Sequence, residues 1–154
     1  MPIPDLNADG FLPAEIFDCT LEEMTERFGQ DCWVDNRLRQ CRSRLFARLC
    51  SYLGEVRRAG IPGALLVDGS FTTSKAEPED IDLALVLPAG HDFAQELRPI
   101  VYNLVSKRRV RQGGYPFDLF VVAEGSLAYQ EVVKLFHRVK DHPELAKGFL
   151  RVRP

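Results

Sequence analysis

Two short apolar segments separated by only twelve residues constrain the fold of this chain more than any other feature. Residues 64–68 and 81–87 are each typical of a buried β-strand, and the link between them runs from Gly69 to Asp80. A parallel crossover usually needs about a dozen residues or more, commonly with a helix. We therefore expect the two strands to pair antiparallel, with one helical turn in the link.

The second apolar segment begins with two charged residues, in the sequence DIDL from Asp80. Side chains alternate between the two faces of a strand, so Asp80 and Asp82 point the same way, roughly 7 Å apart. A later apolar segment, residues 116–122, carries Asp118 between two apolar neighbours. Three carboxylates on one face of adjacent strands would repel each other. A divalent cation such as Mg²⁺, which prefers oxygen ligands, removes that conflict.

The link opens with Gly69 and Ser70, directly after the first apolar segment. Glycine allows the backbone to approach a ligand closely, and a helical turn beginning at Ser70 would present free N–H groups to phosphate oxygens. Ser70 adds a hydroxyl, and Lys75 adds a positive charge for nucleotide binding. Phosphate-binding amides beside metal-binding carboxylates favour phosphoryl or nucleotidyl transfer. Taken alone, each element has a plainer interpretation, as a turn, an Asx turn or a solvated strand edge.

Helix caps and apolar spacing predict the remaining elements. In chain order these are an irregular N-terminal arm that packs on the fold (1–18), a short helix (21–28), a long helix capped by Asp35 and running to Ala59, a helix (92–108), a strand (116–122), a helix capped by Ser126 and running to Lys140, and a short C-terminal strand or extension. Strands and helices alternate too irregularly for a doubly wound parallel sheet. We expect a small mixed sheet with helices packed on it, in the α+β or α/β class.

Composition and charge exclude several classes of protein. The chain has 154 residues, which is typical of one domain. Its net charge of −2 gives no overall attraction to nucleic acid or to an anionic membrane. No apolar run approaches the roughly 20 residues that span a bilayer, and the N-terminus does not resemble a signal peptide. We expect a cytoplasmic protein with no membrane partner, four reduced cysteines, no CxxC pair and no zinc site.

The spacing of the acidic residues resembles the motif of the polymerase-β-like nucleotidyltransferase superfamily. In that motif an apolar residue and G-[GS] are followed by a variable linker and D-h-[DE]-h, where h is apolar. Gly69 and Ser70, nine residues, and then Asp80 and Asp82 match it, while Asp118 supplies a third acid on a later strand. The likeness is greatest to the minimal nucleotidyltransferases, bacterial proteins that are little more than a catalytic core. It covers about residues 64–122, and the wider chain looks like an uncharacterised bacterial family within the superfamily.

The resemblance implies a nucleotidyltransferase fold, with the DxD strand at the centre of the sheet and the third acid on its neighbour. It implies a nucleoside triphosphate substrate, such as ATP, with two Mg²⁺ ions or Mn²⁺ in their place. Gly69 and Ser70 would hold the triphosphate. Asp80 and Asp82 would bind both metals, and Asp118 would bind the one that activates an acceptor hydroxyl, so all three acids would be catalytic. A nucleoside monophosphate would be transferred to the acceptor and pyrophosphate released.

On this basis we divide the single domain, residues 1–154, into an N-terminal arm with helices (1–60), a nucleotidyltransferase core (61–125) and a C-terminal helix with its tail (126–154). Larger members of the superfamily carry a helical domain that grips the base and the acceptor, whereas here only the N-terminal helices and the last helix are available for that role. The acceptor, a protein or a small molecule, is therefore open. The resemblance also implies a partner protein, as acceptor or as the toxin of a toxin–antitoxin type pair.

Two other interpretations remain open. The chain could be a non-catalytic protein-interaction module, antitoxin-like, that retains the nucleotidyltransferase fold. It could also bind nucleic acid through the arginines of the long helix and through the basic cluster at residues 107–111, KRRVR. Arginines on a helix face are usually only solvated, and the cluster could instead line the nucleotide phosphates. A P-loop kinase is disfavoured, because the sequence contains no GxxxxGK[ST] motif.

Overall fold

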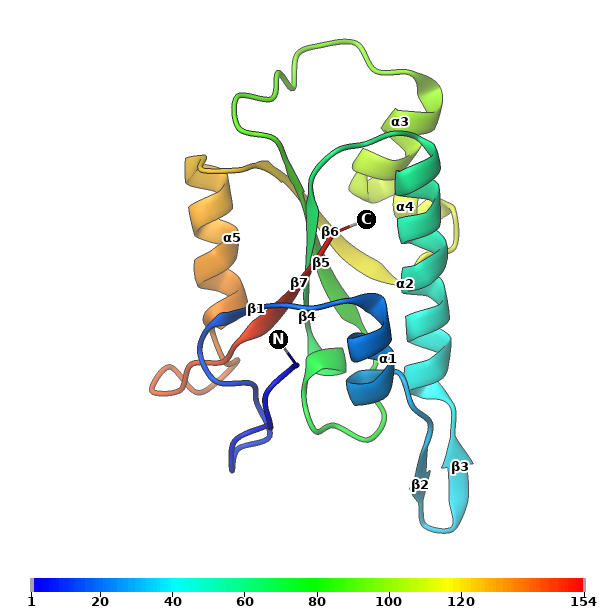
Figure 1. The fold of residues 1–154 in the computed structure, drawn as a ribbon, viewed down its shortest axis with the longest axis vertical. Coiled ribbons are helices and arrows are strands. Elements are labelled where there is room, and N and C mark those ends of the chain that lie inside the picture. The colour runs from blue at the N-terminus through cyan, green and yellow to red at the C-terminus, as the bar shows by residue number, and fades with distance from the viewer. Residues whose placement is uncertain (1, 154) are drawn as a thin grey trace.

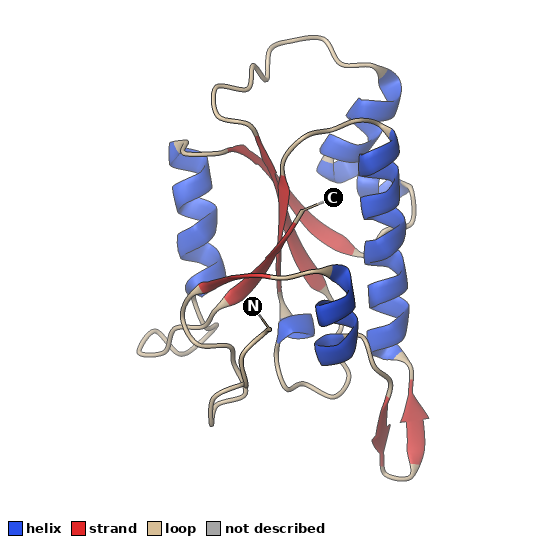
Figure 2. Cartoon of the chain, in the orientation of Figure 1, coloured by secondary structure: helices blue, strands red, loops and turns tan. Residues whose placement is uncertain are grey.

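The chain folds around a five-stranded mixed sheet with helices on both faces, in a computed structural model that describes residues 2–153. The strand order is β1–β7–β4–β5–β6, and a two-stranded hairpin lies outside the sheet. Figures 1 and 2 show α5 against one face and the helices α1 to α4 on the other. The predicted α+β class with a small mixed sheet is confirmed. The elements are β1 (Ile16–Asp18), α1 (Leu21–Phe28), β2 (Cys32–Val34), β3 (Arg37–Arg39), α2 (Cys41–Arg58), β4 (Ala64–Asp68), β5 (Ile81–Leu87), α3 (Pro99–Val105), α4 (Lys107–Gln112), β6 (Phe117–Ala123), α5 (Leu127–His137) and β7 (Phe149–Val152).

The central pair of strands follows the sequence prediction. β4 and β5 have the predicted bounds and pair antiparallel, from Ala64 opposite Val86 to Asp68 opposite Asp82. A single 3₁₀ turn, η1 (Ser70–Thr72), lies in the link between them. β6 then pairs with β5 in parallel, so the strand that carries the DxD sequence lies between two partners.

The two faces of the sheet are covered unequally. Alternate residues of β5, beginning with Ile81 and Leu83, are buried in the larger core against α1 and α2. The other set, Ala84 and Val86, packs in a smaller core with Phe136 of α5. Within the described part of the chain, α5 is the one helix on that second face (Figure 1). The end of the sheet beyond α5 therefore carries no helix on this face among the described residues.

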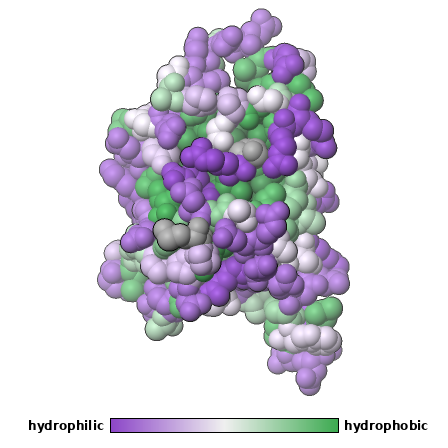
Figure 3. All heavy atoms as spheres, in the orientation of Figure 1, coloured by the Kyte–Doolittle hydropathy of each residue, from purple (hydrophilic) through white to green (hydrophobic). Residues whose placement is uncertain are grey.

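The prediction that Asp35 caps the long helix is wrong. Residues 32–39 form the hairpin β2–β3, and α2 begins only at Cys41. Asp35 and Asn36 have φ values of 50° and 60°, the left-handed backbone that a tight hairpin turn requires and that Asn and Asp tolerate. The hairpin stands clear of the body of the molecule in Figure 3, and it exposes 71% of Trp33 opposite Leu38, which is 45% exposed.

The predicted helix over residues 92–108 is also wrong in extent. Residues 92–98 are not helical, and two short helices, α3 and α4, follow them. Pro99 begins α3, where its missing N–H is not needed. Ser106 adopts an extended conformation between the helices and caps α4. The range predicted as one helix therefore includes exposed apolar residues, among them Phe93 at 57%.

Both ends of the chain join the sheet. The C-terminal strand is one of the two forms expected for the tail, but residues 1–18 were expected to be irregular, and strand β1 within them was not predicted. β7 pairs antiparallel with β4, and β1 pairs parallel with β7. Leu12 of the arm is fully buried. α5 is capped by Ser126 as predicted but ends at His137, three residues before Lys140. Within residues 2–153, no helix combines the length and the hydropathy that a bilayer-spanning segment needs.

Candidate active site

Three aspartates form a row across adjacent strands at the open end of the sheet. In the strand register, Asp68 lies opposite Asp82, and Asp82 lies opposite Asp118. Residues directly opposite each other in a sheet project from the same face, so these carboxylates share the face that α5 leaves open. Asp80 immediately precedes β5. The structure thus brings together all three predicted acids and adds a fourth, Asp68, that the sequence analysis did not single out as a site residue.

The row of aspartates forms the floor of a cavity of about 1110 Å³. Its opposite wall is the end of α5 and the segment 138–147 that follows. This volume is slightly above the roughly 300–1,000 Å³ that is typical of small-molecule pockets. The lining residues combine acids, the Gly-Ser turn, basic side chains and apolar side chains: Phe11, Asp68, Gly69, Ser70, Thr73, Asp80, Asp82, Asp118, Phe120, Leu135, Phe136, Arg138, Val139, Lys140, Asp141, His142, Pro143, Leu145 and Lys147.

Gly69 is required by the backbone at the turn between β4 and η1. Its φ of 90° is a conformation that other residues rarely adopt. A Cβ atom at this position would lie 3.0 Å from the amide nitrogen of Asp82 and 3.3 Å from a carboxylate oxygen of Asp80. Glycine therefore lets the turn pass directly against the start of β5, which places the Gly-Ser turn and the aspartates in one site.

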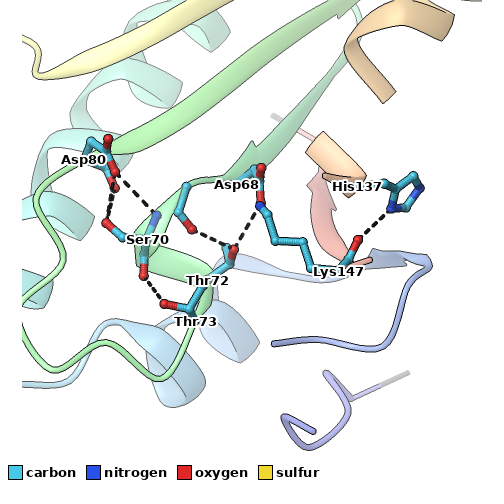
Figure 4. Close-up of polar contacts among 8 residues, drawn as sticks. Asp68, Ser70, Thr72, Thr73, Asp80, His137 and Lys147 are labelled. Atoms are coloured by element: carbon cyan, nitrogen blue, oxygen red, sulfur yellow. Dashed lines mark hydrogen bonds and ion pairs between the residues drawn. The ribbon is translucent and has the colours of Figure 1, made fainter. Parts of the chain in front are cut away.

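Ser70 orients the first aspartate of the DxD sequence. Its hydroxyl donates to Asp80 Oδ1 at 2.9 Å, and its amide N–H donates to the same oxygen at 3.4 Å (Figure 4). The amide of Glu79 in turn donates to the Ser70 hydroxyl at 3.2 Å. The N–H groups that the sequence analysis assigned to phosphate thus face Asp80 in this structure.

Asp82 has the most unfavourable electrostatic position among the three predicted acids. Its pKa is raised from 3.8 to about 6, mainly because burial disfavours the charged carboxylate. The charges of Asp80 and Asp118 raise this pKa further, while Lys147 and Lys107 lower it. A group whose ionised form is opposed by two neighbouring carboxylates is one that a bound cation would stabilise.

Two lysines offset part of the negative charge of the aspartate row. The sequence analysis did not assign either of them to an individual acid. The Lys147 ammonium forms an ion pair with Asp68, in which the side chains are 12% and 5% exposed. The Lys107 ammonium forms an ion pair with Asp118 and lies 5.7 Å from the centre of the Phe120 ring. One residue of the basic cluster 107–111 therefore reaches the site. Lys147 is 79 residues from Asp68 along the chain, and no local sequence signal connects the two.

Lys75 does not join the cavity. Its ammonium lies 3.7 Å from a Glu79 carboxylate oxygen, and both side chains are largely exposed. Its backbone carbonyl instead accepts a hydrogen bond from Arg42, which also donates to the carbonyls of Phe71 and Thr73 at 2.6 Å each. The buried Arg42 guanidinium thus holds the loop below the site in place.

The buried position of this arginine was predictable from its spacing in the sequence. Arg42 lies one helical step before Leu45 and extends the buried stripe of α2 by a turn, so it belongs to the inward face. The sequence analysis had assigned it to a solvated face.

The donor set fits a hard divalent cation, although the side chains are not gathered around one. Within residues 2–153, no three His, Cys, Asp or Glu side chains converge closely enough to hold a metal as they stand. The contacts explain this, because Asp80 is turned onto Ser70 and Asp118 onto Lys107. The carboxylates nevertheless line one cavity and oppose the ionisation of Asp82. Oxygen donors of this kind are the ligands that Mg²⁺ prefers.

Comparison with known proteins identifies the family but not its activity. The model of a family of unknown function, DUF6932, matches residues 4–153, so the chain belongs to that family. No curated protein and no solved structure gave a match.

Proposed function

We propose that the protein is a metal-dependent nucleotidyltransferase of the polymerase-β-like superfamily, which transfers a nucleoside monophosphate from a nucleoside triphosphate to a hydroxyl acceptor. The observation that carries this proposal is the strand register. It sets Asp82 opposite Asp118, with Asp80 and the Gly69-Ser70 turn in the same cavity. A Gly-Ser turn that allows close backbone approach, beside a row of carboxylates, supports phosphate binding and metal binding in one site.

The proposed reaction exchanges one phosphorus–oxygen bond for another. An acceptor hydroxyl oxygen attacks the α-phosphorus of the nucleotide, the bond from that phosphorus to the bridging oxygen breaks, and pyrophosphate leaves. Asp118, which lines the cavity, would take the hydroxyl proton as a base. The Gly69-Ser70 turn holds the triphosphate. When bound by Asp80, Asp82 and Asp118, two Mg²⁺ ions, or Mn²⁺, would supply charge neutralisation and lower the pKa of the hydroxyl.

The acceptor is a protein or a small molecule, and a partner protein would be encoded with the enzyme if it acts in a toxin–antitoxin type pair. The proposal keeps the protein in the cytoplasm, where nucleoside triphosphates and Mg²⁺ are available, and gives it no membrane partner. The cavity walls support a substrate larger than a phosphate, since apolar side chains such as Leu135, Phe120 and Val139 line it together with the acids.

Thermal unfolding tests the proposal directly. The wild type is melted with ATP, GTP, CTP or UTP, each with and without Mg²⁺, beside Asp80→Asn/Asp82→Asn. A ligand at about 100 times its dissociation constant adds about 2.7 kcal/mol, or about 5–10 °C for a domain of this size. We expect at least one nucleotide to give this shift with Mg²⁺, and the double variant to lose it. Asp9→Asn, at an exposed position, is the matched control. Equal shifts in wild type and double variant would refute the proposed site.

The alternative, a non-catalytic interaction module, is favoured by one observation. The hairpin exposes Trp33 and Leu38 side by side on one of its faces, as a protein-binding surface would. Under this alternative, Asp80→Asn/Asp82→Asn would leave the biological function and complex formation intact. Under the proposed function, the double variant would form complexes but lose activity.

A further inference from the structure

Lys147 is held more firmly than the other cations of the cavity. Its backbone N–H donates to the carbonyl of His137 at 3.0 Å, and its carbonyl lies 2.7 Å from His137 Nδ1. Its side chain extends to the ion pair with Asp68 (Figure 4). Arg138 and Lys140 also line the cavity but are exposed. The ammonium of Lys147 therefore has a fixed position at the cavity floor.

The place of this ammonium relates it to the Gly-Ser turn. Asp68 is the last residue of β4 and immediately precedes Gly69, so its ion-pair partner lies at the base of the turn. Lys147 also lines the same cavity as Ser70, and its charge acts on Asp82 across the row. An ammonium held in this cavity beside the Gly-Ser turn is where the negative charge of a polyphosphate would be stabilised.

A purely structural role explains this arrangement poorly. Removing a lysine and a carboxylate from water costs more than their attraction usually returns, and apolar replacements of similar size are often as stable. An ammonium has three N–H donors, and the Asp68 side chain is its one hydrogen-bond acceptor among the described residues. The remaining donors are free for a ligand in the cavity.

We propose that Lys147 binds the β- and γ-phosphates of the nucleotide, with Asp68 as the positioning residue that holds its ammonium at the Gly-Ser turn. This inference rests on the proposed function for the identity of the nucleotide, but its chemistry is polyphosphate recognition. A phosphate chain brings several anionic oxygens to the ammonium, and Asp68 keeps the lysine extended along the cavity floor. The C-terminal segment after α5 thus contributes the triphosphate-binding cation that Lys75 does not provide.

The test measures the binding of inorganic tripolyphosphate with Mg²⁺ by isothermal titration calorimetry. Lys147→Met alone leaves the buried Asp68 unpaired and destabilises the fold, so the informative variant is Asp68→Asn/Lys147→Met, which removes both charges. We expect tripolyphosphate to bind this double variant at least tenfold more weakly than wild type. Asp68→Asn alone keeps the lysine but removes the carboxylate that positions its ammonium, so it should bind tripolyphosphate more weakly than wild type and more tightly than the double variant. Lys140→Met, at an exposed lining position, should change affinity less than threefold.

The outcomes separate this inference from the proposed function. Wild-type affinity in the double variant would overturn the role of Lys147, whatever the nucleotide titrations show. Nucleotide binding to the wild type without tripolyphosphate binding would also overturn it, and would leave the proposed function standing. Lys147-dependent tripolyphosphate binding without any stabilisation by the four nucleotides would support the inference and count against the proposed function. Binding of neither probe would overturn both.

Discussion

Replacing Asp82 by asparagine should make the metal-free protein more stable at neutral pH, although it removes a residue of the candidate active site. The pKa of Asp82 is raised from 3.8 to about 6, mainly because its carboxylate is buried and also because Asp80 and Asp118 repel its charge. A shift of about two units corresponds to about 3 kcal/mol of differential interaction. The side chain is partly exposed, and solvent screening reduces this to about 1–2 kcal/mol.

The sign of the pH dependence follows from which state binds more protons. Between about pH 4 and pH 6 the folded protein holds a proton on Asp82 that the unfolded chain has lost, so the free energy of unfolding falls as pH rises through this window. The stabilising contribution of the protonated carboxyl is complete below pH 4 and is lost above pH 6. Asparagine has no proton to lose, so the variant should lack the Asp82 part of this fall and keep only the part due to Asp68, whose pKa burial also raises to about 6.

Melting curves in EDTA at pH 8 and pH 4 measure the effect. At pH 8, Asp82→Asn should melt about 2–8 °C above wild type, since 1 kcal/mol shifts a domain of this size by about 2–4 °C. At pH 4 the two should melt within about 2 °C of each other. With Mg²⁺ and nucleotide at pH 8 the order should reverse, because only wild type gains from the ligand. A variant less stable than wild type by the same amount at both pH values would refute the reasoning, and Asp9→Asn should show no pH-dependent difference.

Three further expectations concern the scaffold, each measured by urea unfolding at neutral pH. Gly69→Ala should lower the free energy of unfolding by about 1–3 kcal/mol, because alanine at φ 90° is strained and its Cβ would lie 3.0 Å from the amide nitrogen of Asp82. An unchanged unfolding midpoint would contradict this close approach. Arg42→Met should lower the free energy of unfolding by about 3 kcal/mol or more, because it leaves buried carbonyls without a donor. Arg42→Lys should not restore this stability, since one ammonium lacks the fork of donors that the guanidinium provides. Tyr52→Phe should lower the free energy of unfolding by about 1–2 kcal/mol, because it removes the buried hydrogen bond from the Tyr52 hydroxyl to the Leu104 carbonyl at 2.7 Å. An unchanged midpoint would mean that this carbonyl has another donor.

The centre of the fold was predictable because its signals are local and agree with each other. The short link between β4 and β5 leaves little choice except antiparallel pairing, and the structure has that pairing with a single turn in the link. The same reasoning placed Asp80 and Asp82 at the start of β5. The parallel partner β6 brings Asp118 into register with Asp82. The sequence indicated that Asp118 lies on a later strand, but it could not determine which residue of β5 lies opposite.

The errors in the fold arise where local chemistry competes with apolar spacing. Leu38 fell within the long helix predicted from Asp35 to Ala59, yet the Asp35-Asn36 turn favours a hairpin and leaves Leu38 exposed. Pro99 similarly prevents residues 92–98 from forming one helix with the residues after it. Proline suits the first position of a helix and is unsuited to an interior one, so the helix begins at Pro99. In both cases the residue that decides the local structure was visible in the sequence, and the periodic pattern was given too much weight.

The cations of the site could not be predicted, because their positions depend on tertiary structure. Lys147 reaches Asp68 only because β7 inserts beside β4 and the chain after α5 returns across the open face of the sheet. Gly148 makes this return tight, since a Cβ atom there would lie 2.0 Å from the carbonyl oxygen of Pro13. Gly148 thus packs against the N-terminal arm, and the preceding residue, Lys147, forms the ion pair with Asp68 of the aspartate row. A lysine near the end of the chain balances the acids at its centre, and the candidate active site extends well beyond the segment in which its motif lies.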